Sequence, residues 1–221
     1  MNFGLYIHIP FCRQKCLYCD FPSKANLEHI YDRYCAALCR EIAVQGSHFA
    51  DWQVDTVYIG GGTPTVLALE QLRPIVAAIK ANFHLKPEAE ISIEANPGTV
   101  DVEKLAGLLE LGINRISFGV QAFSDRLLRL LGRLHSAAEG IEAVRSASKA
   151  GFENISIDLM YGLPQQTLAD LSDSLSTAVS LPLTHISVYG LQVEEGTPFA
   201  KALADGTLCL PDEDTEEQMY D

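Results

Sequence analysis

The sequence predicts an α/β fold built on a parallel sheet, and three observations favour it. Six short runs rich in β-branched and aromatic residues alternate with amphipathic stretches of helical periodicity. Two of those stretches end before a glycine, Gly112 or Gly151, that can cap a helix. A chain of 221 residues with 48% hydrophobic content is long enough for one sizeable core. Right-handed βα units in series give a barrel, part of a barrel or a doubly wound open sheet.

The expected elements follow one another in regular order. We expect strands at Leu5–Pro10, Thr56–Gly60, Glu90–Ala95, Arg115–Val120, Asn154–Met160 and His185–Tyr189. We expect helices near Leu27–Gln45, Leu69–Phe83, Val102–Leu111, Ala137–Ala150 and Leu168–Val179. A short helical pattern follows, and the acidic run Asp212–Glu217 then suits a helix N-terminus. We interpret residues 1–200 as a core domain and residues 201–221 as the start of a truncated C-terminal region.

Three of the six cysteines lie within eight residues, directly after the first predicted strand. Cys12, Cys16 and Cys19 have the spacing C-x3-C-x2-C, so their thiolates can converge on one soft metal centre. Three ligands are one fewer than a closed zinc site or a fully protein-held [4Fe–4S] cluster requires. A cubane bound here would keep one iron open to another ligand. The alternatives are a zinc ion with a distant fourth ligand, or chance clustering.

The charge and the cysteine usage restrict the partners and the compartment. Lys and Arg total 16 against 29 Asp and Glu, which gives a formal charge of −13. So acidic a surface repels phosphate backbones, which argues against a nucleic-acid partner. Six cysteines without a secretion signal indicate thiols that stay reduced in the cytoplasm. No apolar run approaches the roughly 18–20 residues of a membrane span, so we expect a soluble protein.

Glycines and polar residues follow the predicted strands, at the ends where α/β barrels have their reactive groups. Consecutive glycines in Gly60–Pro64 (GGGTP) let the backbone approach a small zwitterion closely, although such pairs often form only a turn. Glu94 closes the third strand, where a buried carboxylate needs a ligand or a salt bridge as its partner. Gln121, Arg133 and Asp158 follow or end the next two strands. A structural pair between Arg133 and Asp158 is the alternative to a binding role.

The cysteine loop resembles the signature of the radical S-adenosylmethionine (SAM) superfamily. Its cysteines have that spacing, and Tyr18 is the aromatic residue before the last of them. The preceding stretch, Tyr6–Phe11 (YIHIPF), is similar to one branch, the oxygen-independent coproporphyrinogen III oxidases and their relatives. The resemblance extends to about Leu191. It implies a partial (β/α)6 TIM-like barrel of the radical SAM type in place of a doubly wound sheet.

The resemblance also implies cofactors and site residues. The three loop cysteines would bind a [4Fe–4S] cluster, with SAM on the open iron. The glycine stretch corresponds to the motif that binds the methionine amine, and the glutamate after the third strand to a contact of the SAM ribose. In the oxidases, residues that match the polar groups of the next two strands are associated with a second SAM. The cofactor-binding residues expected are Tyr6, Tyr18, Gly61, Gly62, Thr63, Glu94, Gln121, Arg133 and Asp158.

Position 21 separates two branches of this family. In the oxidases a fourth cysteine follows the motif, and a sizeable N-terminal segment precedes it, whereas here Phe21 occupies that position. Both differences match the haem-chaperone branch, whose members are thought to bind haem and deliver it to haem-accepting proteins. The haem-binding histidine of that branch lies in its C-terminal region, beyond the residues seen here. We therefore expect a haem chaperone.

Two other functions are the alternatives. One is decarboxylation of coproporphyrinogen III in porphyrin biosynthesis, through reductive cleavage of SAM to a 5′-deoxyadenosyl radical. The other is radical chemistry on a different substrate, including a modified RNA, against which the acidic charge argues. In each case the electron would come from an external reductant of the flavodoxin type.

The remaining conspicuous residues have structural interpretations. Cys35 and Cys39 lie on one apolar helical face, so we expect both in the core. Cys209 has no partner in the sequence. His8 is expected to be a hydrogen-bonded strand histidine. His135, beside Arg133 in a loop that follows a strand, is the more interesting of the two, although a structural role is favoured for it as well.

Overall fold

The computed structural model of the protein describes residues 2–221. Its centre is a six-stranded parallel sheet with the order β1-β4-β5-β6-β7-β8, which is also the order of these strands along the chain. A doubly wound sheet would reverse its order at a switch point, so the sequential order confirms the partial (β/α)6 TIM-like barrel. The strands are β1 (Asn2–Ile9), β4 (Gln53–Gly61), β5 (His84–Ala95), β6 (Arg115–Gln121), β7 (Asn154–Tyr161) and β8 (His185–Gly190).

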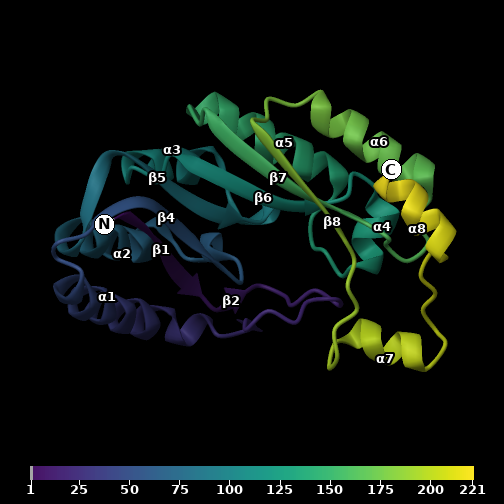
Figure 1. Ribbon diagram of the computed structural model, residues 1–221, viewed down its shortest axis with the longest axis horizontal. Coiled ribbons are helices and arrows are strands. Elements are labelled where there is room, and N and C mark those ends of the chain that lie inside the picture. The colour runs from purple at the N-terminus through teal and green to yellow at the C-terminus, as the bar shows by residue number, and fades with distance from the viewer. Residues whose placement is uncertain (1) are drawn as a thin grey trace.

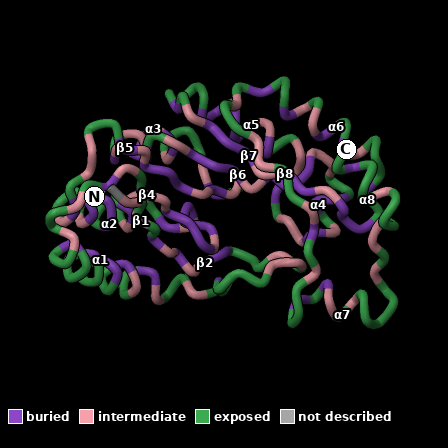
Figure 2. The backbone as a smooth tube through the Cα atoms, viewed as in Figure 1, coloured by how far each residue is buried: buried purple, intermediate pink, exposed green. Residues whose placement is uncertain are grey.

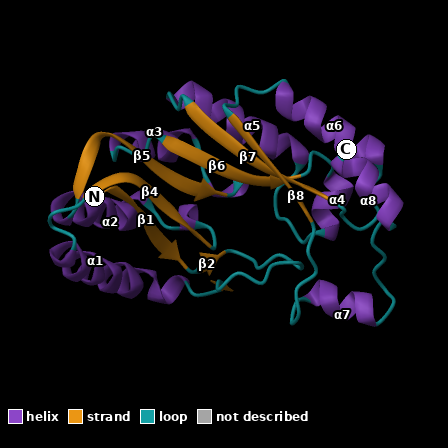
Figure 3. Ribbon diagram, in the orientation of Figure 1, coloured by secondary structure: helices purple, strands orange, loops and turns teal. Residues whose placement is uncertain are grey.

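The helices lie mainly along one side of this curved sheet (Figures 1 and 3). All five helices predicted from the periodicity are present, and three shorter ones follow or interrupt them. The helices are α1 (Tyr31–His48), α2 (Leu69–Asn82), α3 (Val102–Glu110), α4 (Asp125–Leu130), α5 (Ala137–Ala150), α6 (Leu168–Val179), α7 (Pro198–Ala204) and α8 (Glu213–Tyr220).

The core lies between the sheet and the helices, because alternate residues of each strand point to that side. Five isoleucines form a row in register across five neighbouring strands, and all are buried. Figure 2 shows buried stretches along the strands of the sheet. Burial of each such side chain contributes about 1.5–3 kcal/mol. The row consists of Ile7, Ile59, Ile93, Ile116 and Ile155.

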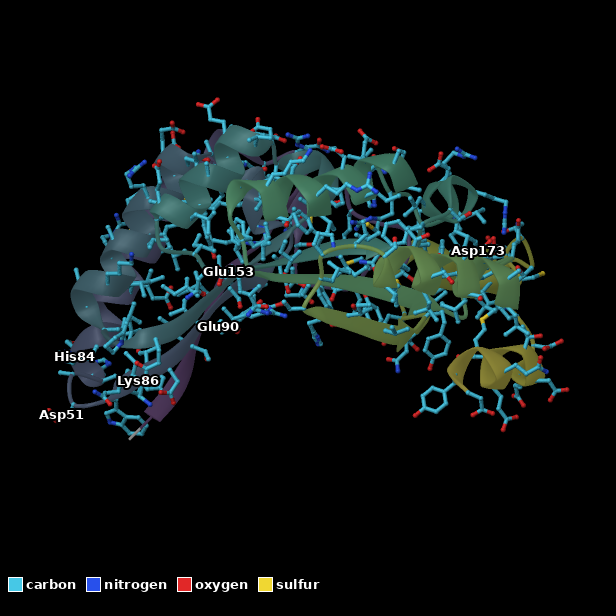
Figure 4. The ribbon with its side chains drawn as sticks, turned by 90° about the horizontal axis from the view of Figure 1, so that it is seen from above. Asp51, His84, Lys86, Glu90, Glu153 and Asp173 are labelled. Atoms are coloured by element: carbon cyan, nitrogen blue, oxygen red, sulfur yellow. The ribbon has the colours of Figure 1, made fainter. Side chains whose placement is uncertain are left out.

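The opposite side of the sheet is polar, because the neighbouring residues of the same strands point there. Arg115 donates to Ser92 Oγ (3.3 Å), which in turn donates to Glu90 Oε1 (2.9 Å). Figure 4 shows Glu90 part-way along the sheet, with His84 and Lys86 at the end where β5 begins. Polar side chains on the inner face of the sheet are therefore hydrogen-bonded to one another across neighbouring strands.

Local capping explains where the helices begin and end. Gly112 (φ +87°) and Gly151 (φ +111°) have left-handed backbone after α3 and α5, which confirms both predicted caps. Ser136 and Thr167 accept from the third residue of α5 and α6, and Glu139 and Asp170 complete the two capping boxes.

The structure differs from the sequence-based expectation mainly in short elements. The stretch expected to open the first helix is a 3₁₀ turn (Glu28–Ile30), and α1 begins only at Tyr31. The two-residue strands β2 (Phe11–Cys12) and β3 (Lys24–Ala25) pair with each other and were not predicted. Neither was α4. Strands of two residues are too short to show a periodicity in the sequence. The pair β2 and β3 lies at the two ends of the cysteine loop.

Residues 198–221, which contain α7 and α8, pack on the barrel. Phe199 and Met219 are buried, and α8 contacts α6 and β7. The backbone N–H of Phe199 donates to Leu17 O (3.1 Å) in the cysteine loop. The predicted boundary at residue 200 stays a prediction. In the part of the chain that the structure describes, no helix is long and apolar enough to cross a membrane.

Candidate metal and cofactor site

A cavity of about 680 Å³ lies at the carboxyl ends of the strands. Parallel strands bring these ends to one rim, so residues far apart in the sequence meet there. Every predicted site residue except Tyr6 lines it. They are Cys12, Cys16, Tyr18, Cys19, Gly61, Gly62, Thr63, Glu94, Gln121, Arg133 and Asp158.

Tyr6 lies beside the cavity and outside its wall. Its ring stacks on Tyr58 with centroids 6.2 Å apart, and Tyr58 donates to Glu94. The Tyr6 hydroxyl and His8 Nδ1 are 2.9 Å apart, and His8 Nε2 lies 3.1 Å from Pro22 O. His8 is thus hydrogen-bonded at both ring nitrogens, as expected, whereas the cofactor-binding role of Tyr6 stays a prediction.

The cysteine loop runs between β2 and β3 and is fixed at several points. Lys24 N donates to Pro10 O (2.9 Å) where the loop returns to the barrel. At its far end Leu17 N donates to Leu131 O (3.1 Å). Between these points Arg13 donates to Gly98 O (2.8 Å). The loop therefore has a defined shape with three free thiols.

Two side chains donate hydrogen bonds to cysteine sulfurs. Arg133 Nη1 lies 3.3 Å from Cys16 Sγ, and Thr63 Oγ1 lies 3.8 Å from Cys12 Sγ. Arg133 also donates to Asn96 Oδ1 (2.7 Å) and to the Gly119 carbonyl. Such donors stabilise thiolates, the form in which cysteine binds metal.

Burial has the opposite effect at Cys19. It raises the pKa of the Cys19 thiol, and the backbone N–H of Phe21 and the nearby Lys15 offset that only in part. A bound cation would reverse the balance, because a coordinating thiol is deprotonated.

The arrangement of the three thiols fits a cluster better than a single ion. Among the described residues, no group of three or more His, Cys, Asp or Glu side chains is placed to bind one metal ion. A cubane is larger and distributes its cysteine ligands over separate irons. The three cysteines line one cavity with space beside them, so they fit a [4Fe–4S] cluster.

The glycine turn brings β4 against the cysteine loop. A Cβ atom at Gly62 would lie 2.5 Å from Phe11 O and 3.0 Å from Cys12 Sγ, so only glycine permits this approach. Gly61 has φ +115°, and its N–H donates to Glu94 Oε2 (3.0 Å). The turn therefore links the carboxylate and the cysteine loop through backbone atoms.

Glu94 is a largely buried carboxylate with two donors. Burial raises its pKa, while the hydroxyl of Tyr58 (2.7 Å to Oε1) and the N–H of Gly61 lower it. Each carboxylate oxygen has a further lone pair. Glu94 can therefore still accept hydrogen bonds from a ligand in the cavity.

The far wall of the cavity contains Gln121 and Asp158. Tyr189 donates to Gln121 Oε1 (2.8 Å), and burial raises the pKa of Tyr189 to about 12. Burial also raises the pKa of Asp158, against the effect of Ser187. The described residues form no ion pair between Asp158 and Arg133, so the structural pair considered above is absent there.

Sequence reasoning missed the partners of the predicted residues. Tyr58 and Tyr189 occupy inward positions of β4 and β8, which strand alternation could have identified. Asn96, the acceptor for Arg133, lies two residues after Glu94. Its pairing with Arg133 depends on tertiary structure alone.

The other three cysteines do not line the cavity. Cys35 is buried in the core on α1, and burial raises its pKa to about 11. Cys39 packs half-buried against the same core, whereas Cys209 is exposed. These positions confirm the core interpretation of the helix cysteines.

Comparison with known proteins identifies close relatives. A model of the radical SAM superfamily matches residues 6–178. The chain is 44% identical over 219 residues to the Heme chaperone HemW of Bacillus subtilis, covering 98% of this chain and 57% of that protein. It is 39% identical over 219 residues to the Heme chaperone HemW of Escherichia coli, covering 99% and 57%. The chain thus spans little more than half the length of these curated relatives.

Solved structures show the same architecture. Coproporphyrinogen III oxidase (HemN) of Escherichia coli, described as a radical SAM enzyme, superposes with a TM-score of 0.87 and 32% identity. The match covers 98% of this chain and 50% of that one. Elp3 of Methanocaldococcus infernus superposes with a TM-score of 0.67 and 17% identity, over 99% and 52% of the two chains, which shows the fold alone.

Proposed function

The chain belongs to the radical SAM superfamily, and on that premise we propose that it is the SAM- and cluster-binding core of a haem chaperone. In this proposal the protein binds haem and delivers it to haem-accepting proteins. The observation that supports the proposal most is the cavity itself, which combines three thiols, a glycine turn and a buried carboxylate. The high identity to relatives that are called heme chaperones favours this branch.

The loop cysteines are the proposed ligands of a [4Fe–4S] cluster. Cys12, Cys16 and Cys19 would bind three irons and leave the fourth for SAM, while Arg133 and Thr63 donate to two of the sulfurs. The chemistry that such a cluster supplies is one-electron reduction of SAM, with a flavodoxin-like protein as the proposed electron donor.

The remaining wall is the proposed SAM site. Backbone groups of Gly61–Thr63 would bind the methionyl amine, and Glu94 would accept from the ribose hydroxyls. Lys15 and Arg133 are the two cationic side chains of the wall, against five carboxylates. That excess favours a cationic ligand such as a sulfonium. The carboxylates are Asp20, Glu94, Asp158, Glu194 and Glu216.

Phe21 favours the chaperone over the oxidase. Its ring is 57% exposed and lines the cavity where the oxidase branch has a fourth cysteine. An apolar ring can neither coordinate a metal nor donate a hydrogen bond to a substrate. The alternative, decarboxylation of coproporphyrinogen III, rests on the superposition with HemN, a less similar protein.

A pair of assays tests the proposal on a chain that extends over the full length of the curated relatives. The protein is reconstituted anaerobically with iron and sulfide, titrated with haem, and then supplied with coproporphyrinogen III, SAM and a reductant. We expect saturable haem binding and no decarboxylation. Sustained turnover of coproporphyrinogen III would contradict the chaperone function.

A further inference from the structure

The segment Leu131–His135, here called the bridging segment, connects the cysteine loop with β6. On the loop side, its first two carbonyls accept from Leu17 N (3.1 Å) and from Gln14 Nε2 (3.0 Å). On the strand side, Arg133 donates to the Gly119 carbonyl, and His135 Nε2 lies 3.2 Å from Val120 O. One short segment thus contacts both walls of the cavity.

β6 is irregular where the bridging segment contacts it. Gly119 pairs with Asp158 of β7, but the next pair is Gln121 with Leu159, so Val120 is an extra, bulged residue. Leu159 points into the core and is fully buried, whereas Gln121 lines the cavity. Gln121 lies on the same side of β6 as Ser117 and Gly119, which also line the cavity, and the bulge sets it opposite Leu159 at a place where the regular ladder ends.

The backbone at Gln121 is strained. Its φ is +71°, which is rare for a residue with a side chain. Ala122 N donates to Val120 O (3.0 Å), so Gln121 is the centre of a three-residue turn of the rarer, strained kind. Such strain persists only where surrounding contacts hold the backbone, and it concentrates at functional sites.

His135 is the side chain that contacts this turn through the Val120 carbonyl. Val120 is fully buried, so its carbonyl has no access to bulk water and needs donors within the protein. A carbonyl only accepts, so Nε2 of His135 must be the donating nitrogen. His135 is 4% exposed and lines a second cavity of about 180 Å³ beside Cys16. That cavity has room for a water to satisfy Nδ1, which has no partner among the described residues.

We propose that His135 is a positioning residue of the cofactor site. By donating to the Val120 carbonyl it fixes the strained turn that directs Gln121 into the cavity. It does so from the same segment that anchors the cysteine loop, so the ligand wall and the cluster loop keep a constant spacing. His135 acts through Gln121 and does not contact the ligand itself.

Two substitutions of similar polarity separate this role from mere burial. His135→Gln places an amide nitrogen at about the reach of Nε2 and keeps the donor. His135→Asn is equally polar but too short to reach the carbonyl. SAM affinity, a readout that rests on the proposed function, is measured calorimetrically on the cluster-loaded protein. We expect a loss of about tenfold with Asn, the scale of one buried hydrogen bond, and less than about twofold with Gln. Equal affinities of the two variants would overturn the proposal.

A double-mutant cycle tests whether the effect passes through Gln121. In a Gln121→Ala background the side chain that His135 is proposed to orient is gone. His135→Asn should then weaken SAM binding no further. A full additional loss in that background would show that His135 acts by another route, and would overturn the proposal.

Hydrogen exchange of the cluster-free protein gives a readout without SAM. His135→Asn should speed amide exchange in residues 119–123 and 14–17, whereas His135→Gln should match the unmodified protein. If the unmodified protein binds no SAM, the proposed function fails, and the exchange pattern still decides the role of His135. If His135→Asn does not fold, His135→Gln decides alone: unchanged exchange supports the donor role, and faster exchange overturns it.

Discussion

Identical side chains have different chemistry in this protein because their surroundings differ. Replacement of any loop cysteine, Cys12, Cys16 or Cys19, by alanine should abolish cluster assembly, because a cubane here depends on all three thiolates. The measurement is anaerobic reconstitution, followed by absorbance and by an iron count of about four per chain.

The other cysteines provide matched controls for that experiment. Cys35→Ala, Cys39→Ala and Cys209→Ala should leave the iron content unchanged, because none of these residues lines the cavity. A cluster that persisted without Cys16, or disappeared without Cys35, would contradict the proposed ligand set.

Glu94 should contribute directly to SAM binding. Glu94→Ala removes a buried acceptor at the proposed ribose position and should weaken binding by about 1–3 kcal/mol. The measurement is the SAM dependence of the paramagnetic resonance spectrum of the reduced cluster. Tyr58→Phe keeps the carboxylate and removes one of its two donors, so a smaller effect is expected. Unchanged affinity in Glu94→Ala would leave Glu94 a purely structural role.

His135 should make the cluster-free protein sensitive to mild acid. Burial, together with the nearby Arg133, lowers the pKa of His135 to about 4 from its ordinary value of 6.5. The unfolded chain therefore binds this proton more readily, and stability falls as the pH decreases from about 6.5 towards 4. Between pH 7 and pH 5 the loss should be about 1–2 kcal/mol.

The contribution of His135 to this loss of stability is isolated by comparison with His135→Gln. The free energy of unfolding of both proteins is measured with urea at pH 7 and at pH 5. Burial raises the pKa of Glu94 and Asp158, so these groups favour the folded state as the pH falls, but they are present in both proteins and cancel. The Gln variant should lose less stability than the unmodified protein. An equal loss in both would show that His135 does not titrate in this range.

The residues that sequence could identify are those whose chemistry is evident without a partner. Three thiols on one loop, a glycine run and a glutamate at a strand end are informative in any fold. Asn96 and Tyr58 were not identified, because an amide or a phenol gains its role only from the neighbour that it contacts. Residue type alone does not specify that neighbour.

Among the secondary-structure elements, period and length decided what could be predicted. The long strands alternate between the isoleucine row and the polar inner face, and all six were recognised. The two-residue strands β2 and β3 are too short to alternate. The bulge at Val120 leaves no trace in the pattern either, because apolar residues alternate regularly with small or polar ones from Ile116 to Gln121.

The turn after β4 should be intolerant of any side chain at Gly62. Gly62→Ala would bring its Cβ within 2.5 Å of Phe11 O, so the turn or the cysteine loop would have to move. We expect lower iron incorporation and weaker SAM binding. Gly98→Ala is the matched control, in the 3₁₀ turn Pro97–Thr99 after β5, since a Cβ there meets no atom within 4 Å. Equal behaviour of the two variants would contradict the close approach described above.

For the molecule as a whole, hydrophobic periodicity could not choose between a barrel and a doubly wound sheet. Both contain the same βα units, and they differ only in which strands become neighbours. Resemblance in the loop after the first strand made that choice, and the sequential strand order confirmed it. Hydrophobic periodicity therefore predicted the individual βα units. The order in which their strands pair was predicted only from the resemblance of the cysteine loop.

The described residues include no evident ligand for haem iron in the large cavity. The large cavity contains no histidine in its described wall. His8 is hydrogen-bonded at both ring nitrogens, and His135 is buried and donates to Val120. An imidazole ligand for haem iron, such as globins use, is therefore missing from the cavity.

The 221-residue chain should consequently bind the cluster and SAM but hold haem weakly or not at all, whereas a chain that extends over the full length of the curated relatives should bind haem. Spectroscopic haem titrations of the two proteins, each loaded with cluster, measure the difference. Phe21→Cys serves as a further test, because position 21 is exposed and its substitution should leave folding unchanged. Restoring the thiol should not produce coproporphyrinogen III decarboxylation, since one cysteine does not recreate the substrate site of the oxidase branch. Tight haem binding by the 221-residue chain would instead place the iron ligand inside the barrel, and His135, whose Nδ1 has no partner among the described residues, would be the first side chain to replace.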